Sequence, residues 1–242
     1  MVTAILLAAG SGNRMQGQVA DKVLANLNGL PAFCYSLQAF HRSGVIDDYI
    51  VVYRDEAQKS QLAAAVQQCE LQHLKINAVA GGQERQDSVI HALNIANESC
   101  DYVFIHDCAR PCVTYQAIQS LHQAVLRDQA ASLAHPVIDT IKRIPAPKQL
   151  HKVELEDLDR QRLWAMETPQ AFNFASILKA YQLVSQKKLS ITDDTAAARL
   201  IGLNTTLVPN QIPNPKLTTP GDLAYINFLM ASRPPVDSDL HS

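Results

Sequence analysis

The chain lacks the features that draw a protein to nucleic acid or into a membrane. Its 242 residues include 21 basic and 23 acidic side chains, which gives a formal net charge of −2. This balance produces no overall positive field of the kind that attracts nucleic acid or anionic lipid. The first apolar run, from Ala4 to Ala9, is too short for a secretory signal, and no stretch approaches bilayer length. We therefore expect a cytoplasmic protein in which any anion site is built locally.

Cysteine is scarce and forms no recognisable pattern. The five cysteines are odd in number, show no CxxC spacing and have no histidine-rich companion segment, which argues against a disulfide framework and a zinc site. With 47% hydrophobic and 18% charged residues and no internal repeat, the composition predicts one large α/β domain. We place this domain at residues 1–232 and expect residues 233–242 to form a flexible tail.

Runs of β-branched and aromatic residues alternate along the chain with runs that favour helix. Strands are expected at Val2 to Leu7, Tyr49 to Tyr53, Leu74 to Val79 and Tyr102 to Ile105. Helices are expected at Ala32 to His41, Glu56 to Cys69, Ser88 to Asn97 and Tyr115 to Arg127. The alternation resumes over Phe174 to Lys187, Asp193 to Leu200, Thr205 to Val208 and Asp222 to Ala231. This order predicts an α/β fold with a mostly parallel, twisted sheet covered by helices on both faces.

One segment, from Lys142 to about Leu163, breaks this alternation. It contains Pro145 and Pro147 and continues as a polar stretch rich in charges. Such a segment is either a protruding β-hairpin or a plain surface insertion. A protruding arm would favour dimerisation.

A glycine-rich turn directly follows the first expected strand. Gly10 and Gly12 let the backbone turn tightly and aim its N–H groups at an anion, and Arg14 and Lys22 add two cations nearby. The turn lacks the third glycine of the dinucleotide fingerprint GxGxxG. It also lacks the Gly-Lys followed by Ser or Thr with which a P-loop ends. It predicts a phosphate cradle of another kind, and the alternative is a plain strand-exit loop with an ordinary surface arginine and lysine.

Two further loops are expected at the same edge of the sheet, because the carboxyl ends of parallel strands meet there. In the loop 81–88, Ser88 can bond a ligand or serve as an ordinary residue of a helix N-terminus, and Glu84 with Arg85 can form a structural pair. Asp107 follows a strand, where it can accept a ribose hydroxyl, hold a hydrated Mg²⁺ or cap its own loop. The convergence of three loops favours a nucleotide site.

Hydroxyl and basic side chains flank both roots of the suspected arm. Thr140, Arg160 and Thr168 have the chemistry to grip a second, phosphorylated substrate. Taken alone, residues of this kind are more often structural. Lys216 is a late lysine, and an isolated lysine is usually a solvated side chain.

Seven segments occur in the order found in 2-C-methyl-D-erythritol 4-phosphate cytidylyltransferases, the IspD family of nucleotidyltransferases. They are LLAAGSGNRM, GGQERQDSV, HDCARPC, DTIK, LWAMETPQAF, TDD and NPKLT. The first marks the wider nucleotidyltransferase group, whereas GGxERxDSV with DxARP and TPQ is specific to this branch. The chain resembles the family from Ala4 to about Asp222. The resemblance implies a single nucleotidyltransferase domain of Rossmann-like fold, with a projecting β-hairpin arm that joins a homodimer.

The resemblance also implies roles for individual residues. Those implied to contact the nucleotide, CTP, are Ala8, Ala9, Gly10, Gly12, Gly82, Ser88, Asp107 and Cys108. Asp107 is also implied to hold Mg²⁺, directly or through water. Those implied to act in catalysis are Arg14, Lys22, Arg160 and Lys216. Those implied to bind the acceptor, with the arm residues coming from the neighbouring subunit, are Arg110, Thr140, Arg160, Thr168 and Lys216.

By this resemblance the protein transfers CMP from CTP to 2-C-methyl-D-erythritol 4-phosphate in isoprenoid precursor synthesis. Two departures from the family pattern keep alternatives open. Lys22 lies in Asp-Lys-Val, eight residues after Arg14, where the family has Pro-Lys-Gln at a spacing of seven. Lys216 follows Pro-Asn-Pro, where the family has an acidic residue and then Asn-Ile. The alternatives are a cytidylyltransferase for another polyol phosphate, such as ribitol 5-phosphate, and a catalytically silent nucleotide-binding protein.

Overall fold

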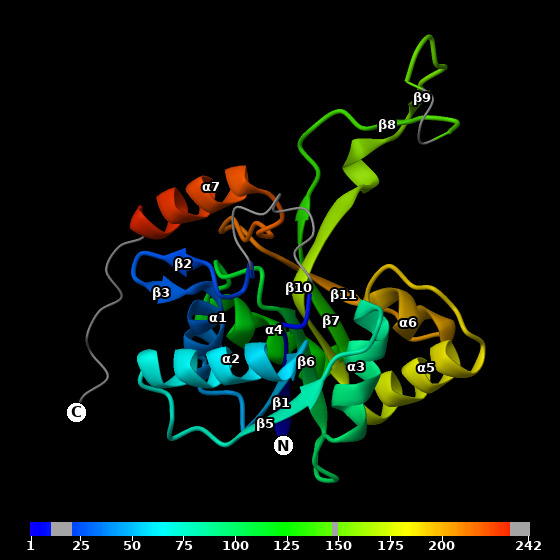
Figure 1. Ribbon diagram of the computed structural model, residues 1–242. Coiled ribbons are helices and arrows are strands. Elements are labelled where there is room, and N and C mark those ends of the chain that lie inside the picture. The colour runs from blue at the N-terminus through cyan, green and yellow to red at the C-terminus, as the bar shows by residue number, and fades with distance from the viewer. Residues whose placement is uncertain (11–20, 147–149, 233–242) are drawn as a thin grey trace.

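A seven-stranded sheet forms the centre of the computed structural model, which describes residues 1–10, 21–146 and 150–232 (Figure 1). Its strands are β1 (Val2–Leu7), β4 (Asp48–Tyr53), β5 (Ile76–Ala80), β6 (Tyr102–Asp107), β7 (Ala130–Pro136), β10 (Trp164–Asn173) and β11 (Thr206–Pro209). They lie in the order β11-β7-β10-β6-β1-β4-β5. Neighbouring strands run parallel except at β10, which is antiparallel to both β6 and β7. The expectation of a mostly parallel sheet is confirmed.

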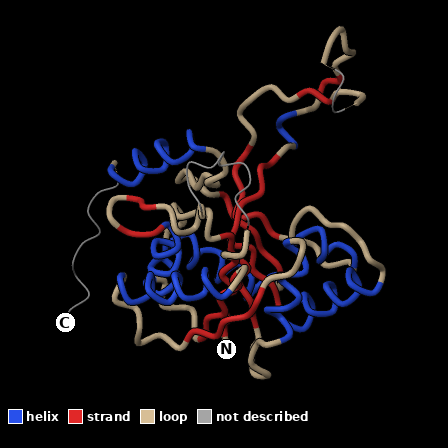
Figure 2. The backbone as a smooth tube through the Cα atoms, in the orientation of Figure 1, coloured by secondary structure: helices blue, strands red, loops and turns tan. Residues whose placement is uncertain are grey.

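Helices cover both faces of the sheet, as expected (Figure 2). On one face pack α1 (Ala32–Arg42), α2 (Glu56–Gln68), α4 (Tyr115–Asp128) and α7 (Pro220–Ala231). On the other face pack α3 (Arg85–Asn94), α5 (Phe174–Gln186) and α6 (Asp194–Leu200). In β1, Ala4 and Leu6 enter the first core while Ile5 enters the second, because side chains alternate across a strand. Within the described ranges, no helix is long and apolar enough to cross a membrane.

The helix α3 begins three residues earlier than the sequence predicts, at Arg85. A capping box explains this start, because Asp87 Oδ2 accepts a hydrogen bond from the N–H of Glu84 at 2.9 Å and the Glu84 side chain bonds in return. As a result Arg85 and Ser88 belong to the first turn of α3 and point from a helix rather than from a loop.

Two strands of the sheet, β7 and β10, are absent from the expected elements. The sequence of β7 is rich in alanine, which has a low strand propensity. In β10, Pro169 falls inside the strand, and the pairing with β7 shifts register between Met166 and Gln170. Proline in a run argues against a central strand, so local pattern gave no signal for β10.

The segment from 142 to 163 is a projecting hairpin, as one of the two alternatives predicts (Figure 1). Its short strands β8 (Lys142–Arg143) and β9 (Glu156–Asp157) pair antiparallel and are followed by the 3₁₀ helix η2 (Arg160–Arg162). A second two-stranded sheet, of β2 (Asn26–Leu27) and β3 (Leu30–Pro31), lies outside the main sheet. Pro147 and the tail expected at 233–242 lie outside the described residues.

Candidate active site

A cavity of about 430 Å³ opens at the carboxyl ends of β1, β4, β5 and β6. The chain order reverses there, since it runs from β1 outward to β5 and returns to β6 on the other side of β1. Open α/β sheets bind their ligands at such switch points. The residues predicted from the sequence that line this cavity are Ala9, Gly10, Lys22, Gly82, Ser88, Asp107 and Lys216. The loops after β1, β5 and β6 therefore converge as predicted.

Lys22 reaches the glycine turn in spite of its shifted position in the sequence. A Cβ atom placed on Gly10 would lie 3.4 Å from the Nζ of Lys22, so the ammonium sits directly beside the Gly10 backbone. Lys22 therefore lines the cavity even though its spacing from Arg14 in the sequence is one residue longer than in the family pattern. Gly12 and Arg14 belong to residues 11–20 and lie outside those that the structure describes.

The loop after β5 passes so close to its neighbours that only glycine fits at two positions. A Cβ on Gly81 would lie 2.7 Å from the Cβ of Ala9, and a Cβ on Gly82 would lie 2.2 Å from the Cβ of Asp87. The Gly82 N–H donates to the Oγ of Ser88 at 3.1 Å, and that hydroxyl bonds the Glu84 carbonyl at 3.3 Å. Ser88 thus orders this loop while it also lines the cavity.

Asp107 is held between two cations at the end of β6. Its Oδ1 accepts a hydrogen bond from the Nε of Arg85 at 2.9 Å, and its Oδ2 accepts one from the Nζ of Lys216 at 2.5 Å. Burial by itself would raise the pKa of Asp107, but the Arg85 guanidinium and the Lys216 ammonium outweigh it and hold that pKa well below its usual range. The carboxylate is therefore charged, and Lys216 is paired rather than a solvated side chain.

Arg85 does not pair with Glu84, which the sequence offered as a structural alternative. Its Nη1 and Nη2 atoms instead form a two-pronged ion pair with Asp194 at 2.9 and 2.8 Å, and the Tyr181 hydroxyl donates to the same carboxylate at 2.5 Å. Asp194 is fully buried, so this pairing fixes the guanidinium strongly. The sequence contained Asp194 in the segment TDD but indicated no partner for it.

Thr168 lies behind Asp107 rather than in the wall of the cavity. Its hydroxyl oxygen accepts a hydrogen bond from the Asp107 N–H at 3.0 Å and lies 3.2 Å from the Nδ1 of His106. The Nε2 of His106 in turn lies 3.1 Å from the Ser36 hydroxyl on α1. This buried chain of polar groups fixes the end of β6 where Asp107 projects.

Arg110 holds the segment that carries Lys216. Its Nη1 donates to the backbone carbonyl of Asn214 at 2.7 Å, and its Nη2 donates to the Met166 carbonyl at 3.4 Å. Asn214 is itself buried and donates to the carboxylate of Glu167 at 3.0 Å. Arg110 is therefore engaged next to the cavity and is not part of its lining.

Ala8 and Cys108 are buried next to residues that line the cavity and are not part of its lining. The Ala8 N–H donates to the Val52 carbonyl at 2.9 Å, and the Ala8 carbonyl accepts from the Nε2 of Gln58 at 3.0 Å. The Cys108 side chain is fully buried, and burial raises the pKa of its thiol well above the ordinary value. All five cysteines are buried, and no disulfide joins any two of them in the part of the chain that the structure describes.

Thr140 lies at the root of the arm and Arg160 lies on the arm, and neither lines the cavity of its own chain. Both are exposed, and the Arg160 Nη1 donates to the carbonyl of Ile138 at 2.9 Å. The structure of one chain therefore does not bring these two residues to Asp107. Their expected role stays a prediction that requires a second subunit.

The chain matches known cytidylyltransferases over nearly its whole length. The family model for IspD, 2-C-methyl-D-erythritol 4-phosphate cytidylyltransferase, matches residues 2–232. The enzyme of that name from Halalkalibacterium halodurans is 34% identical, covering 96% of this chain and 97% of the relative. The one from Clostridium beijerinckii is 36% identical, covering 95% and 98%.

Solved structures agree with this assignment. The crystal structure of 2-C-methyl-D-erythritol 4-phosphate cytidylyltransferase from Francisella tularensis superposes with a TM-score of 0.78 at 29% identity, covering 94% of this chain and 99% of that one. A 4-diphosphocytidyl-2C-methyl-D-erythritol synthase from Anaerococcus prevotii superposes with a TM-score of 0.82 at 22% identity, covering 96% of both chains, which supports the fold alone. The chain belongs to the IspD family, 2-C-methyl-D-erythritol 4-phosphate cytidylyltransferase.

Proposed function

We propose that this protein transfers the cytidylyl group of CTP to 2-C-methyl-D-erythritol 4-phosphate. The observation that carries the proposal is the cavity at the sheet edge, where Lys22 lies beside the glycine turn and Lys216 lies on Asp107, in a chain of the IspD family. The products are 4-diphosphocytidyl-2-C-methyl-D-erythritol and pyrophosphate. We further propose that residues 1–232 act as one nucleotidyltransferase domain.

The reaction needs charge control more than proton removal. An oxygen of the acceptor phosphate attacks the α-phosphorus of CTP, a new P–O bond forms, and the bond to the β-phosphate oxygen breaks to release pyrophosphate. A phosphate monoester is mostly dianionic at neutral pH because its second pKa is about 6, so no general base is required. What the site must supply is positive charge against two polyanions, which Lys22 and Lys216 provide with Arg14.

The nucleotide half of the site is assigned to the two loops that meet beside β1. The glycine turn and the loop of Gly82 and Ser88 offer backbone groups and a hydroxyl for the cytosine and ribose. Lys22 is placed to hold the triphosphate, because its ammonium already lies at Gly10. Lys216, which lines the cavity from the segment after β11, is proposed to bind the acceptor phosphate.

Asp107 fits a magnesium ion that is held mainly by phosphate oxygens. Among the described residues there is no group of three or more potential metal ligands, so these residues form no all-protein cage for Mg²⁺. Mg²⁺ commonly binds to one or two carboxylates together with substrate phosphates and water. When bound, it would supply further positive charge to the triphosphate. The Asp107 carboxylate, which lines the cavity, fits this mode and would hold the ion together with the triphosphate.

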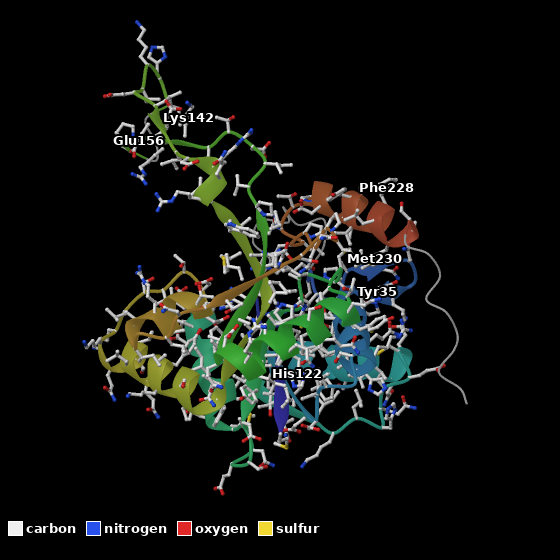
Figure 3. All side chains as sticks on the ribbon, turned by 180° about the vertical axis from the view of Figure 1, so that it is seen from behind. Tyr35, His122, Lys142, Glu156, Phe228 and Met230 are labelled. Carbon is white, nitrogen blue, oxygen red and sulfur yellow. The ribbon has the colours of Figure 1, made fainter. Side chains whose placement is uncertain are left out.

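The arm is proposed to complete the site of a second subunit in a homodimer. Large apolar side chains are exposed on the arm and at its root, with 76% of Leu150 and 80% of Ile138 exposed. Lys142 and Glu156 lie far out along this arm, well separated from the body of the chain (Figure 3). An exposed apolar arm of this kind is typical of an interface between copies. Such a dimer would bring Thr140 and Arg160 to the partner's cavity.

The proposal is tested by pyrophosphate release with separate acceptors. The purified protein with CTP and Mg²⁺ should release pyrophosphate with 2-C-methyl-D-erythritol 4-phosphate and not with ribitol 5-phosphate. Release with ribitol 5-phosphate alone would assign the rival acceptor. CTP binding, seen as a thermal shift, without pyrophosphate release from any acceptor would show a silent nucleotide-binding protein and contradict the proposal.

A further inference from the structure

Gln58 is a buried polar side chain whose hydrogen bonds all go to the rim of the nucleotide cavity. Its Oε1 accepts from the backbone N–H of Arg54 at 2.6 Å. Its Nε2 donates to the carbonyl of Ala8 at 3.0 Å and to the Oδ2 of Asp21 at 2.6 Å. One fully buried amide therefore ties together the exits of β1 and β4 and the segment that carries Lys22.

The backbone of Gln58 is itself fixed. It lies in the first turn of α2, and the N-cap residue Asp55 accepts the Gln58 N–H at 2.8 Å. A side chain that projects from a capped helix turn holds its partners more rigidly than one that projects from a loop. A buried amide also loses its hydration, and its hydrogen bonds must offset that cost. If this position served only to fill space, an apolar side chain would do so without the cost.

Asp21 connects the Gln58 side chain to the backbone on either side of Lys22. Its Oδ1 accepts from the Val23 N–H at 3.1 Å, so the bonds of Asp21 bracket Lys22 on both sides. Its Oδ2 accepts from Gln58 and also from the Nη1 of Arg54 at 3.1 Å. The arginine offsets the negative charge of a carboxylate that is only 7% exposed and lies near the expected phosphates.

We propose that Gln58 is a positioning residue that sets the affinity for the triphosphate of CTP by fixing Lys22 beside Gly10. The inference rests on the proposed function and deepens it. Gln58 itself does not touch the nucleotide; it acts through Asp21 on the lysine and through Ala8 on the glycine turn. Without Gln58, the Asp21 carboxylate would keep the Arg54 side chain and the Val23 N–H as partners among the described residues, and it would lose its tie to the exits of β1 and β4.

The test is a double-mutant cycle read out as CTP binding. The dissociation constant of CTP with Mg²⁺ is measured by calorimetry, without acceptor, for Gln58→Leu in the natural background and in Lys22→Ala. We expect Gln58→Leu to weaken binding by about tenfold or more in the natural background, and by less than about threefold in Lys22→Ala. The melting temperature should fall equally in both backgrounds, because the packing change is the same.

The matched control is Gln61→Leu, since Gln61 is exposed on the same helix and should leave CTP binding unchanged. Where Gln58→Leu does not fold, Asp21→Ala in the same two backgrounds decides, with the same expected loss of coupling. Equal losses of CTP affinity in both backgrounds would overturn the inference while leaving the proposed function intact. Failure of the unsubstituted protein to bind CTP would overturn the proposed function, and the inference with it.

Discussion

The Nζ of Lys216 lies 2.5 Å from the Oδ2 of Asp107, a residue 109 positions earlier in the chain. Asp107 belongs to the strand beside the nucleotide loops, whereas Lys216 comes from the segment after the last strand of the sheet. The ion pair therefore joins the two halves of the proposed site.

Removing Lys216 should impair the acceptor half of the reaction more than CTP binding. For Lys216→Ala we expect a loss of roughly 10²–10³ in kcat/KM for the acceptor, the range found when one preorganised cation or donor is lost. The dissociation constant of CTP should change much less. Steady-state kinetics with the acceptor varied, and calorimetry with CTP, measure the two effects. Lys179→Ala, on the exposed side of α5, is the control. In Lys216→Ala, an equal loss of kcat/KM for the acceptor and of CTP affinity would refute the assignment of Lys216 to the acceptor.

Replacing Gly82 by alanine should weaken CTP binding. The new Cβ would lie 2.2 Å from the Cβ of Asp87, so the loop must shift, which disturbs the hydrogen bond from the Gly82 N–H to the Ser88 hydroxyl. We expect CTP affinity to fall by about tenfold or more. At Gly221 a Cβ would meet only the Thr219 Oγ1, at 3.9 Å, so Gly221→Ala is the matched control. Unchanged CTP affinity in Gly82→Ala would show that this loop does not contact the nucleotide.

His106 should make the folded protein less stable as the pH falls below neutrality. Burial lowers the pKa of His106 from its ordinary value of 6.5 to about 3. Between these values the unfolded chain binds a proton that the folded protein does not, so the free energy of unfolding falls with falling pH. The expected slope is at most about 1.4 kcal/mol per pH unit from this group.

Denaturant unfolding between about pH 4.5 and 7, which covers the upper part of this interval, measures that slope. His106→Gln should flatten the pH dependence, since the side chain can no longer take up a proton on unfolding. His151→Gln on the exposed arm is the control and should leave it unchanged. An unaltered slope in His106→Gln would mean that the buried imidazole is not neutral.

Active sites shared between subunits should be visible in a mixed dimer. A dimer of one Lys22→Ala subunit and one Arg160→Ala subunit, purified with two different tags, has one intact site if Arg160 serves the partner's cavity. Its turnover should then be about half that of the unsubstituted dimer, although each variant alone is nearly inactive. Turnover near zero in the mixed dimer would mean that both residues serve the same chain.

The sequence predicts much of the sheet and its helices, because their signals are local. The apolar run of β1 and the helical pattern of α4 are visible within a few residues, and both elements are confirmed. β10 was missed because Pro169 interrupts its pattern, and its place in the sheet depends on pairing with β6 and β7. No local signal predicts a strand that is stabilised mainly by its neighbours.

The candidate site shows the same division. The glycine turn with Lys22 nearby, Ser88 and Asp107 follow from motifs at strand ends, whereas the role of Lys216 follows from the resemblance. The partners that fix them were not found, since Asp194 meets Arg85 across 109 positions and Gln58 meets Asp21 across 37. Such pairings depend on the packed fold, and one sequence offers no pattern for them.

The most direct test of the central claim is a crystal structure of the protein with CTP and Mg²⁺. The cytosine should lie between the glycine turn and Gly82, with the ammonium of Lys22 on the triphosphate and Lys216 directed at the α-phosphate side of the cavity. CTP bound elsewhere, or bound there with Lys22 and Lys216 both turned away from its phosphates, would contradict the proposed site.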